Sequence, residues 1–182
     1  APALLAAAGE LGVALLPLDD EGSAQRLHPL WRALLLKQAR ERLDDARWST
    51  YQAEFGRAFE QRGSLELALA HYVDAGATDE LARSLREHAW PLLNSPRRAS
   101  IRQWIERLPA PVRDADPELR HMWAWSQTGV APAQAAEALN AAADGYRARS
   151  LYDRELRALS DLAALLFWQD RAIEFDLTCV RA

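Results

Sequence analysis

The sequence predicts an all-α protein of consecutive amphipathic helices, with one short β-hairpin near its N-terminus. From about Asp45 onward, apolar residues recur three and four positions apart, and Gly, Pro or Ser separates one such stretch from the next. Only residues 11–28 break this pattern. We therefore expect a first part, residues 1–45, followed by a helical part, residues 46–182.

The first two helices of the helical part have the clearest boundaries. An aromatic residue stands at every fourth position from Tyr51 to Phe59, which is typical of one helical face, and Gly63 ends that stretch. Ser64 then occupies an N-cap position, and Gly76 closes the second helix. The apolar face of this second helix consists of Leu65, Ala68, Leu69, Tyr72 and Val73.

Further amphipathic stretches continue the helical pattern to the end of the chain. Two of them end before the proline turns "NSP" and "PAP", and their apolar faces are Leu81, Leu85, Ala89 and Leu92, then Ile101, Trp104, Ile105 and Leu108. The next three read "DPELRHMWAWSQTG", "APAQAAEALNAAADGYRA" and "DRELRALSDLAALLFWQ". A last stretch carries Ile173, Leu177 and Val180.

Residues 11–28 have the composition of a short β-hairpin. The run "LGVALLPLD" is apolar and partly β-branched, "DEGS" has turn chemistry, and "AQRLH" can return as a second strand. With a helix before and a helix after it, this hairpin would form the end of a winged-helix unit. The alternative is an irregular loop between two helices.

An internal repeat gives the helical part its predicted architecture. Small and aromatic residues in residues 52–76 resemble the tetratricopeptide pattern, namely Gly56, Phe59, Gly63, Ala68, Tyr72 and Ala75. A small residue lets the paired helix approach closely, and an aromatic residue fills the space between pairs. Later units match the tetratricopeptide pattern less closely. Gly129, Ala136 and Ala143 keep the pattern of small residues in a shifted register, and Trp168-Gln169 marks the last turn. We predict a superhelix of helical hairpins, with a generic helical bundle as the alternative.

Composition excludes several classes of protein. With 22 basic and 26 acidic residues the net charge is -4, so the chain as a whole has no electrostatic basis for binding nucleic acid. The single cysteine, Cys179, excludes an internal disulfide and fits a reducing, cytoplasmic location. No apolar run approaches the roughly 18 residues of a membrane span. Because the chain starts at Ala1 without a methionine, we expect it to be a piece of a larger protein.

The residues offer no catalytic or metal-binding motif, so we expect no enzyme activity. The four histidines, none of which has the paired spacing of a zinc site, are His28, His71, His88 and His121. Neighbouring acids such as Asp19-Asp20 and Asp44-Asp45 point to different sides or cap helices. Neither GxxxxGK[ST] nor GxGxxG occurs, which excludes a phosphate-binding loop of these kinds.

Four tryptophans are the candidates for a surface that binds an effector or partner: Trp104, Trp123, Trp125 and Trp168. Stacked helix pairs form a concave face suited to extended ligands, and large aromatic side chains on that face would bind them. Core packing competes for the same residues, because aromatic side chains at helical spacing are usually buried.

Three stretches together resemble a known family: "LGVALLPLDDEGSAQRLHPLWRALL", "YQAEFGRAFEQRGSLELALAHYVDAG", and "LARSLREHAWPLL" with "IRQWIERLP". They are similar to the middle of large bacterial transcription activators of the MalT type, the LuxR-related STAND regulators. In that family a P-loop ATPase leads into a winged-helix segment, a helical arm and a tetratricopeptide-like superhelix, and a LuxR-type helix-turn-helix ends the chain. The resemblance covers residues 1 to about 128 closely, and "PLDDEG…HPLWRALL" is its most specific piece.

The resemblance implies a coupling and sensing segment without ATPase or DNA-binding activity of its own. Its implied partners are the ATPase domain upstream and the helix-turn-helix domain downstream in the same chain, and a small-molecule inducer or regulatory protein. No cofactor is expected within these residues, and ATP or ADP is expected on the ATPase domain. The alternative function is a free-standing helical-repeat scaffold for protein–protein interaction.

The resemblance also assigns a role to His28. In the wider STAND class, a histidine within a Met-His-Asp motif at the end of the winged-helix domain reaches the β-phosphate of ADP and holds the resting state. The stretch "RLHPLWRALL" resembles this motif, with Leu27 in place of the methionine and Pro29 in place of the aspartate. This implies that His28 senses the nucleotide. The alternative is that His28 merely precedes a helix, since proline is favourable in the first helical turn.

Overall fold

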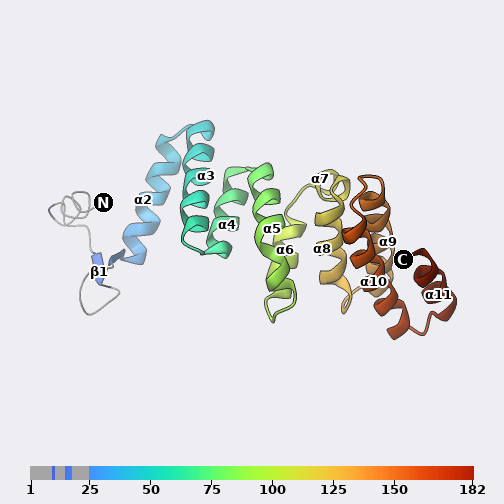
Figure 1. Cartoon of the computed structure of the whole chain (residues 1–182). Coiled ribbons are helices and arrows are strands. Elements are labelled where there is room, and N and C mark those ends of the chain that lie inside the picture. The colour runs from blue at the N-terminus through green and yellow to red at the C-terminus, as the bar shows by residue number, and fades with distance from the viewer. Residues whose placement is uncertain (1–9, 11–14, 18–24) are drawn as a thin grey trace. The chain divides into compact units, whose positions relative to one another are not determined.

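The computed structural model of the chain describes residues 10, 15–17 and 25–182 (Figure 1). Contacts within the chain divide it into two compact units, residues 1–50 and residues 51–182, and each is described here by itself. The division falls inside helix α3 (Asp45–Gln61), whereas the sequence places a boundary between residues 45 and 46.

The first unit contains the two strands of a hairpin. Strands β1 (Leu15–Pro17) and β2 (Gln25–Leu27) pair antiparallel, with Leu15 opposite Leu27 and Pro17 opposite Gln25. The strands predicted within residues 11–28 are therefore confirmed, while the turn predicted between them lies outside the described residues. The helix expected before the hairpin falls in residues 1–10, of which the structure describes only Glu10.

Helix α2 (Pro29–Arg42) follows the hairpin directly. Proline at its first position has a backbone angle that suits the helix and lacks only an N–H that no helical carbonyl would accept. The basic residues Arg40 and Arg42 lie in its last turn, where their positive charges interact favourably with the negative end of the helix dipole. Local sequence therefore fixes both ends of this helix.

The described residues from 51 onward are helices joined by short turns (Figure 1), which confirms the all-α class. After α3 the elements are α4 (Leu65–Ala75), α5 (Thr78–Leu93), α6 (Arg98–Glu106), α7 (Ala110–Ala115), α8 (Pro117–Gln127), α9 (Pro132–Arg147), α10 (Tyr152–Trp168) and α11 (Ala172–Arg181). The last long helix ends at Trp168 with Gln169 as its C-cap, as the sequence predicts. Mainly neighbouring helices pack on one another, and α8 also packs against α5 and α6.

The core of residues 51–182 contains the apolar faces predicted for α4, α5 and α6. The faces predicted for α3 and α11 are wrong as core, because Tyr51, Phe55, Ile173, Leu177 and Val180 are exposed. One cluster joins α4, α5, α6 and α8 through fully buried side chains such as Leu69, Leu85 and Ile101. Alanine and leucine fill the interfaces of α9 with α8 and α10, where Leu139 has no exposed surface. Each such side chain contributes about 1.5–3 kcal/mol by its burial. The helices are therefore held by tertiary packing, as expected for helices of this length.

One predicted close approach between helices is confirmed, and one is wrong. A Cβ atom built on Gly56 would lie 2.5 Å from a ring carbon of Tyr72, so only glycine admits this aromatic ring. Gly129 has no atom within 4 Å of such a Cβ, because it lies in the turn after α8. The later close approach is instead at Gly145, whose Cβ would meet Pro117 at 2.9 Å.

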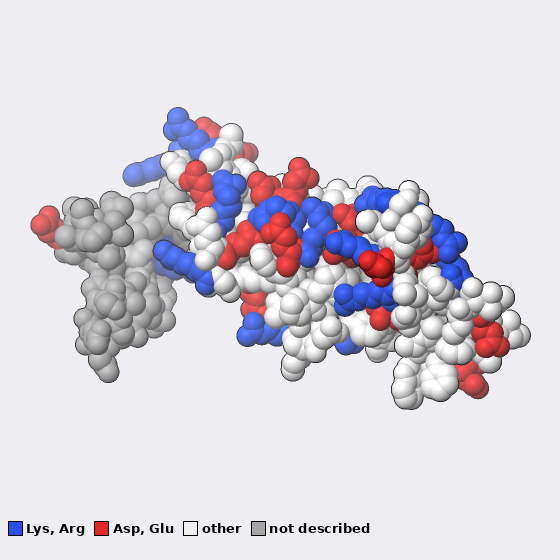
Figure 2. All heavy atoms as spheres, viewed as in Figure 1, with Lys and Arg blue, Asp and Glu red and all other residues white. Residues whose placement is uncertain are grey.

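Charges of both signs intermix on the surface. Figure 2 shows basic and acidic side chains next to each other over much of the viewed face. No helix among the described residues is both long and apolar enough to cross a lipid bilayer.

Candidate functional site

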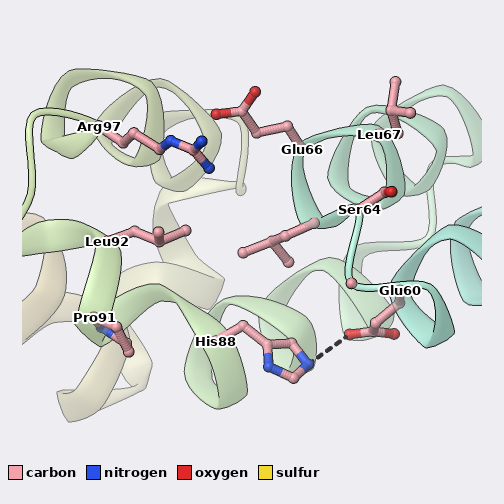
Figure 3. A pocket seen from close by; sticks show the side chains of 10 residues that line it. Glu60, Ser64, Glu66, Leu67, His88, Pro91, Leu92 and Arg97 are labelled. Carbon is pink, nitrogen blue, oxygen red and sulfur yellow. Dashed lines mark ion pairs between the residues drawn. The ribbon is translucent and has the colours of Figure 1, made fainter.

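A pocket of about 410 Å³ lies where the α3–α4 turn, α5 and the start of α6 meet (Figure 3). Its lining combines a polar inner wall, an apolar floor and a charged rim. The lining residues are Glu60, Gly63, Ser64, Leu65, Glu66, Leu67, His88, Pro91, Leu92 and Arg97. Such a mixture of apolar surface and a few polar groups is typical of small-ligand sites.

The turn between α3 and α4 depends on glycine. Gly63 has a φ of 71°, a left-handed conformation that other residues rarely adopt. The N–H of Ser64 donates to the carbonyl of Phe59, which closes the end of α3. Ser64 occupies the predicted N-cap position of α4, but its side chain makes no capping hydrogen bond. The turn places Ser64 at the pocket wall instead.

The floor and the opposite wall come from α5. Pro91 lies inside this helix, where it lacks the N–H that would bond to the carbonyl of Glu87. Leu92, one residue later, contributes apolar surface to the pocket together with Leu65 of α4. The proline therefore stands on an exposed helical face next to the cavity, where a missing helical bond remains accessible to solvent.

A buried carboxylate organises the inner wall. Oε2 of Glu60 accepts a hydrogen bond of 2.7 Å from the Tyr72 hydroxyl and one of 2.6 Å from Nη2 of Arg83. Its other oxygen, Oε1, lies 3.3 Å from Nε2 of His88, the contact drawn as a dashed line in Figure 3. Nη1 of Arg83 also donates to Glu87 at 2.7 Å. Glu60 thus connects three helices: α3, α4 and α5.

These contacts perturb the acid–base properties of the wall. Burial alone would raise the pKa of Glu60, but Arg83, Ser84 and Tyr72 outweigh it and lower the pKa to about 2. Burial and the neighbouring Glu60 carboxylate raise the pKa of Tyr72 to about 12. Glu60 is therefore ionised and Tyr72 neutral at any physiological pH.

One oxygen of this carboxylate, Oε1, makes no hydrogen bond of normal geometry to a described residue. Oε1 and the hydroxyl of Ser84 are both buried without such a bond. Nε2 of His88, whose side chain is 45% exposed, lies 3.3 Å from Oε1, and Ser84 is a second neighbour of this carboxylate. Glu87, next to it, is 51% exposed. Ligand atoms of Glu60, Glu87 and His88 lie within 4.8 Å of one another and open to solvent.

The rim of the pocket carries opposite charges. Figure 3 shows Arg97, the N-cap of α6, and Glu66, in the first turn of α4, extending over the cavity. A guanidinium group binds carboxylates or phosphates, and a carboxylate binds amines. With Leu65 and Leu92 between them, these groups suit a ligand that has a charged end and an apolar body.

None of the four predicted tryptophans lines this pocket. Trp104 is half-buried on α6, where it packs against the core cluster. Trp168 is 83% exposed at the end of α10, so it remains available to a partner. Trp104 therefore fits the prediction of core packing, and Trp168 fits the prediction of an exposed surface residue.

Trp123 and Trp125 are also half-buried and pack against the core cluster. Each ring carries an arginine: Arg113 lies 4.8 Å above the Trp123 ring, and Arg98 lies 5.3 Å above the Trp125 ring. Nε1 of Trp125 donates to Asn94 at 3.0 Å. These contacts occupy the aromatic faces that a ligand would need.

His28 belongs to the first unit and is not among the residues that line the pocket. It is the N-cap of α2, and its Nδ1 accepts a hydrogen bond of 3.3 Å from the N–H of Leu30. This contact accounts for a histidine directly before Pro29, and it is the structural role that the sequence leaves open. With Nδ1 as acceptor, the ring proton of neutral His28 resides on Nε2, the atom that would donate to a phosphate.

Sequence reasoning missed the residues of the inner wall. Glu60, one residue after the aromatic face that ends at Phe59, lies one helical turn after Gly56 and so faces the same neighbour, Tyr72. An acid at this position was the available indication of a buried polar contact. The expectation that no histidine binds metal rests on spacing within one helix, whereas Glu60 reaches His88 from a different helix.

No protein-family model matches the chain, and no curated protein or solved structure matches it either. The resemblance to MalT-type activators therefore depends on the quoted stretches alone.

Proposed function

We propose that this chain is the signal-coupling and effector-binding segment of a STAND-type bacterial transcription activator. Residues 1–45 would be the end of the winged-helix domain, and residues 46–182 the helical arm and a tetratricopeptide-like superhelix. ATP or ADP would bind to the upstream ATPase domain, and DNA to the downstream helix-turn-helix. The pocket between α3 and α6 is the observation that carries this proposal, because it gives an effector a place to bind.

The pocket is suited to couple binding to helix arrangement. Its charged rim groups stand on different helices, Glu66 on α4 and Arg97 at the start of α6. An effector that contacts both would bind best to one relative arrangement of these helices and would shift the population toward it. The intermixed surface charge supports a role in which this segment does not itself bind DNA.

His28 would report the nucleotide state in this scheme. Its Nε2 would donate to a phosphate oxygen of ADP, a contact of about 1.5–3 kcal/mol for a charged acceptor. His28→Ala would then lower ADP affinity of the full-length regulator about ten- to a hundredfold and activate transcription without inducer. If His28 acts only as the N-cap of α2, the same change destabilises the isolated chain and produces no constitutive activity.

A protein-interaction scaffold is the second candidate, and a specific surface favours it. The end of α10 and the outer face of α11 expose a group of large apolar side chains: Phe167, Trp168, Ile173, Leu177 and Val180. Exposed apolar groups of this size commonly contact a partner protein. This surface includes Trp168, one of the four tryptophans that the sequence nominates.

The coding sequence on both sides of this chain distinguishes the two candidates. The regulator requires a GxxxxGK[ST] loop upstream and a helix-turn-helix downstream, whereas a scaffold requires neither. In the full-length regulator, Arg97→Glu should abolish the transcriptional response to inducer and leave the uninduced level unchanged. Arg107→Glu is the matched control, because Arg107 is exposed at the other end of α6 and does not line the pocket. An equal loss of the transcriptional response to inducer in Arg97→Glu and Arg107→Glu would exclude the pocket as the effector site.

A further inference from the structure

We propose that Glu60, Glu87 and His88 form a Zn²⁺ site at the inner wall of the α3–α6 pocket. This inference stands on side-chain geometry and does not depend on the proposed regulatory function. Glu60 comes from α3, and the neighbouring residues Glu87 and His88 come from α5. Three protein ligands with water in a fourth position are the usual arrangement of an open zinc site.

The spacing of the ligand atoms fits zinc. Zn–N and Zn–O bonds of about 2.0–2.2 Å place tetrahedral ligand atoms about 3.3–3.6 Å apart. Oε1 of Glu60 and Nε2 of His88 are 3.3 Å apart, already at this spacing. Nε2 of His88 lies 3.8 Å from Oε2 of Glu87, whose exposed side chain has room for the small movement required.

Oε1 of Glu60 is a buried oxygen of a carboxylate whose further neighbours are the side chains of His88 and Ser84. Oε1 makes no hydrogen bond of normal geometry, although its carboxylate is ionised. A buried charged oxygen without a full partner is costly, and a bound cation removes that cost. An imidazole N–H can donate to one carboxylate oxygen, whereas Zn²⁺ would bind the Glu60 oxygen and the His88 nitrogen together.

Tyr72 and Arg83 support Glu60, while Arg83 also donates to Oε2 of Glu87, a contact that the metal would replace. Both donate to Oε2 of Glu60, which leaves Oε1 directed at His88. Hydrogen-bonded neighbours of this kind orient metal-binding carboxylates in known sites. The two carboxylates of Glu60 and Glu87 outnumber the single guanidinium of Arg83, so the cluster still attracts a cation.

The mixture of ligands selects among metals. Mg²⁺ and Ca²⁺ prefer sites made entirely of oxygen, while an imidazole nitrogen with carboxylates suits Zn²⁺ or Co²⁺. His88 and Glu60 both line the pocket, so a metal here would turn its fourth position toward the cavity. Water would fill that position in the absence of another ligand.

Titration of the metal-free chain with Zn²⁺ in a calorimeter tests the proposal. We expect one Zn²⁺ per chain, bound at least about ten- to a hundredfold more weakly by His88→Gln and by Glu87→Gln, since even loss of an outer-shell contact has that effect. Both side chains are about half-exposed, so these variants should fold, which their circular dichroism spectra will show. Co²⁺ in place of zinc should give visible absorption bands that His88→Gln removes.

Three matched variants exclude other zinc ligands. His28→Gln removes a histidine of the first unit, Glu54→Gln removes an exposed acid of α3, and Cys179→Ser removes the exposed thiol. Each should bind Zn²⁺ as the parent does. The assignment would be overturned if His88→Gln kept the parent's zinc affinity, or if one of the three controls lost as much zinc affinity as His88→Gln. Displacement of zinc by an equal concentration of Mg²⁺ would also overturn it.

Discussion

Two histidine–carboxylate pairs in residues 51–182 have opposite surroundings. His88 faces Glu60 at the wall of the pocket and is 45% exposed, whereas His121 contacts Asp161 at 2.8 Å and is only 1% exposed. Trp90 and Tyr146 approach the His121 ring with ring centroids 4.8 and 5.9 Å away. The sealed pair can only hold α8 and α10 together, while the open pair can accept a ligand.

The comparison shows that pairing alone does not identify a functional histidine. Both pairs join different helices, and both involve a carboxylate at hydrogen-bonding or ion-pairing distance. What differs is access: His88 lines a cavity and is 45% exposed, whereas His121 is 1% exposed.

Removal of the sealed histidine should have the largest effect on stability. His121→Ala leaves a cavity beside Trp90 and Tyr146 and deprives Asp161 of its partner, at a cost of about 2–5 kcal/mol in the free energy of unfolding. Urea denaturation measures this cost. His88→Ala in metal-free buffer is the matched variant, for which we expect at most about 1 kcal/mol, as for an exposed ion pair. Equal costs would show that the two pairs do not differ as described.

Next in size is overpacking beside the open pair. Gly56→Leu places a side chain where a Cβ atom would already lie 2.5 Å from the Tyr72 ring. We expect the free energy of unfolding to fall by about 1–3 kcal/mol. Gly129→Leu serves as the control because no atom lies within 4 Å of its Cβ position. A thermal midpoint that stays unchanged in Gly56→Leu would argue against the α3–α4 packing.

A smaller, pH-dependent effect is expected at Glu60. Its pKa of about 2 in the fold lies below the ordinary value of 4.5, so its charge stabilises the folded state above about pH 4.5. That contribution is lost as the pH falls toward 2. Glu60→Gln should therefore be less stable than the parent by about 1 kcal/mol at neutral pH. The difference should shrink on acidification, and a difference that persists unchanged at pH 2 would contradict the assigned pKa.

The smallest effect on stability is expected at the apolar surface of α10 and α11. Trp168→Ala should change the free energy of unfolding by no more than about 0.5 kcal/mol, because the side chain is 83% exposed. Trp104→Ala, which removes a half-buried ring, should cost more. Thermal unfolding of both variants checks this order, and a reversed order would mean that the end of α10 is covered by other parts of the protein.

The sequence predicts helix boundaries well where a single residue determines the backbone. Gly63 and Gly76 both adopt the left-handed conformation that ends a helix. Gly56 was also recognisable, because a small residue opposite an aromatic one at repeat spacing implies a close approach. Gly129 was mistaken for such a position because a turn glycine and a packing glycine look alike in sequence. The two differ only in whether a neighbouring helix packs against the glycine, as Tyr72 does at Gly56 and no residue does at Gly129.

The candidate site was not predictable because its residues meet through tertiary packing. Glu60 reaches His88 only when α3 and α5 pack in one particular rotation, which periodicity within each helix does not determine. Trp168 is one of the four tryptophans that the sequence proposes for a partner surface, and it is 83% exposed. The arginines that cover Trp123 and Trp125 come from α7 and α6, so they too are set by packing.

The difference in access between the two pairs can be measured directly by chemical modification. Diethyl pyrocarbonate reacts with neutral imidazoles that solvent can reach, and mass spectrometry locates the modified residues. We predict that His88 is modified in the folded chain, that Zn²⁺ protects it, and that His121 reacts only after unfolding. Modification of His121 as fast as that of His88 in the folded chain, or the same rate at His88 with and without Zn²⁺, would contradict the account of an open site and a sealed one.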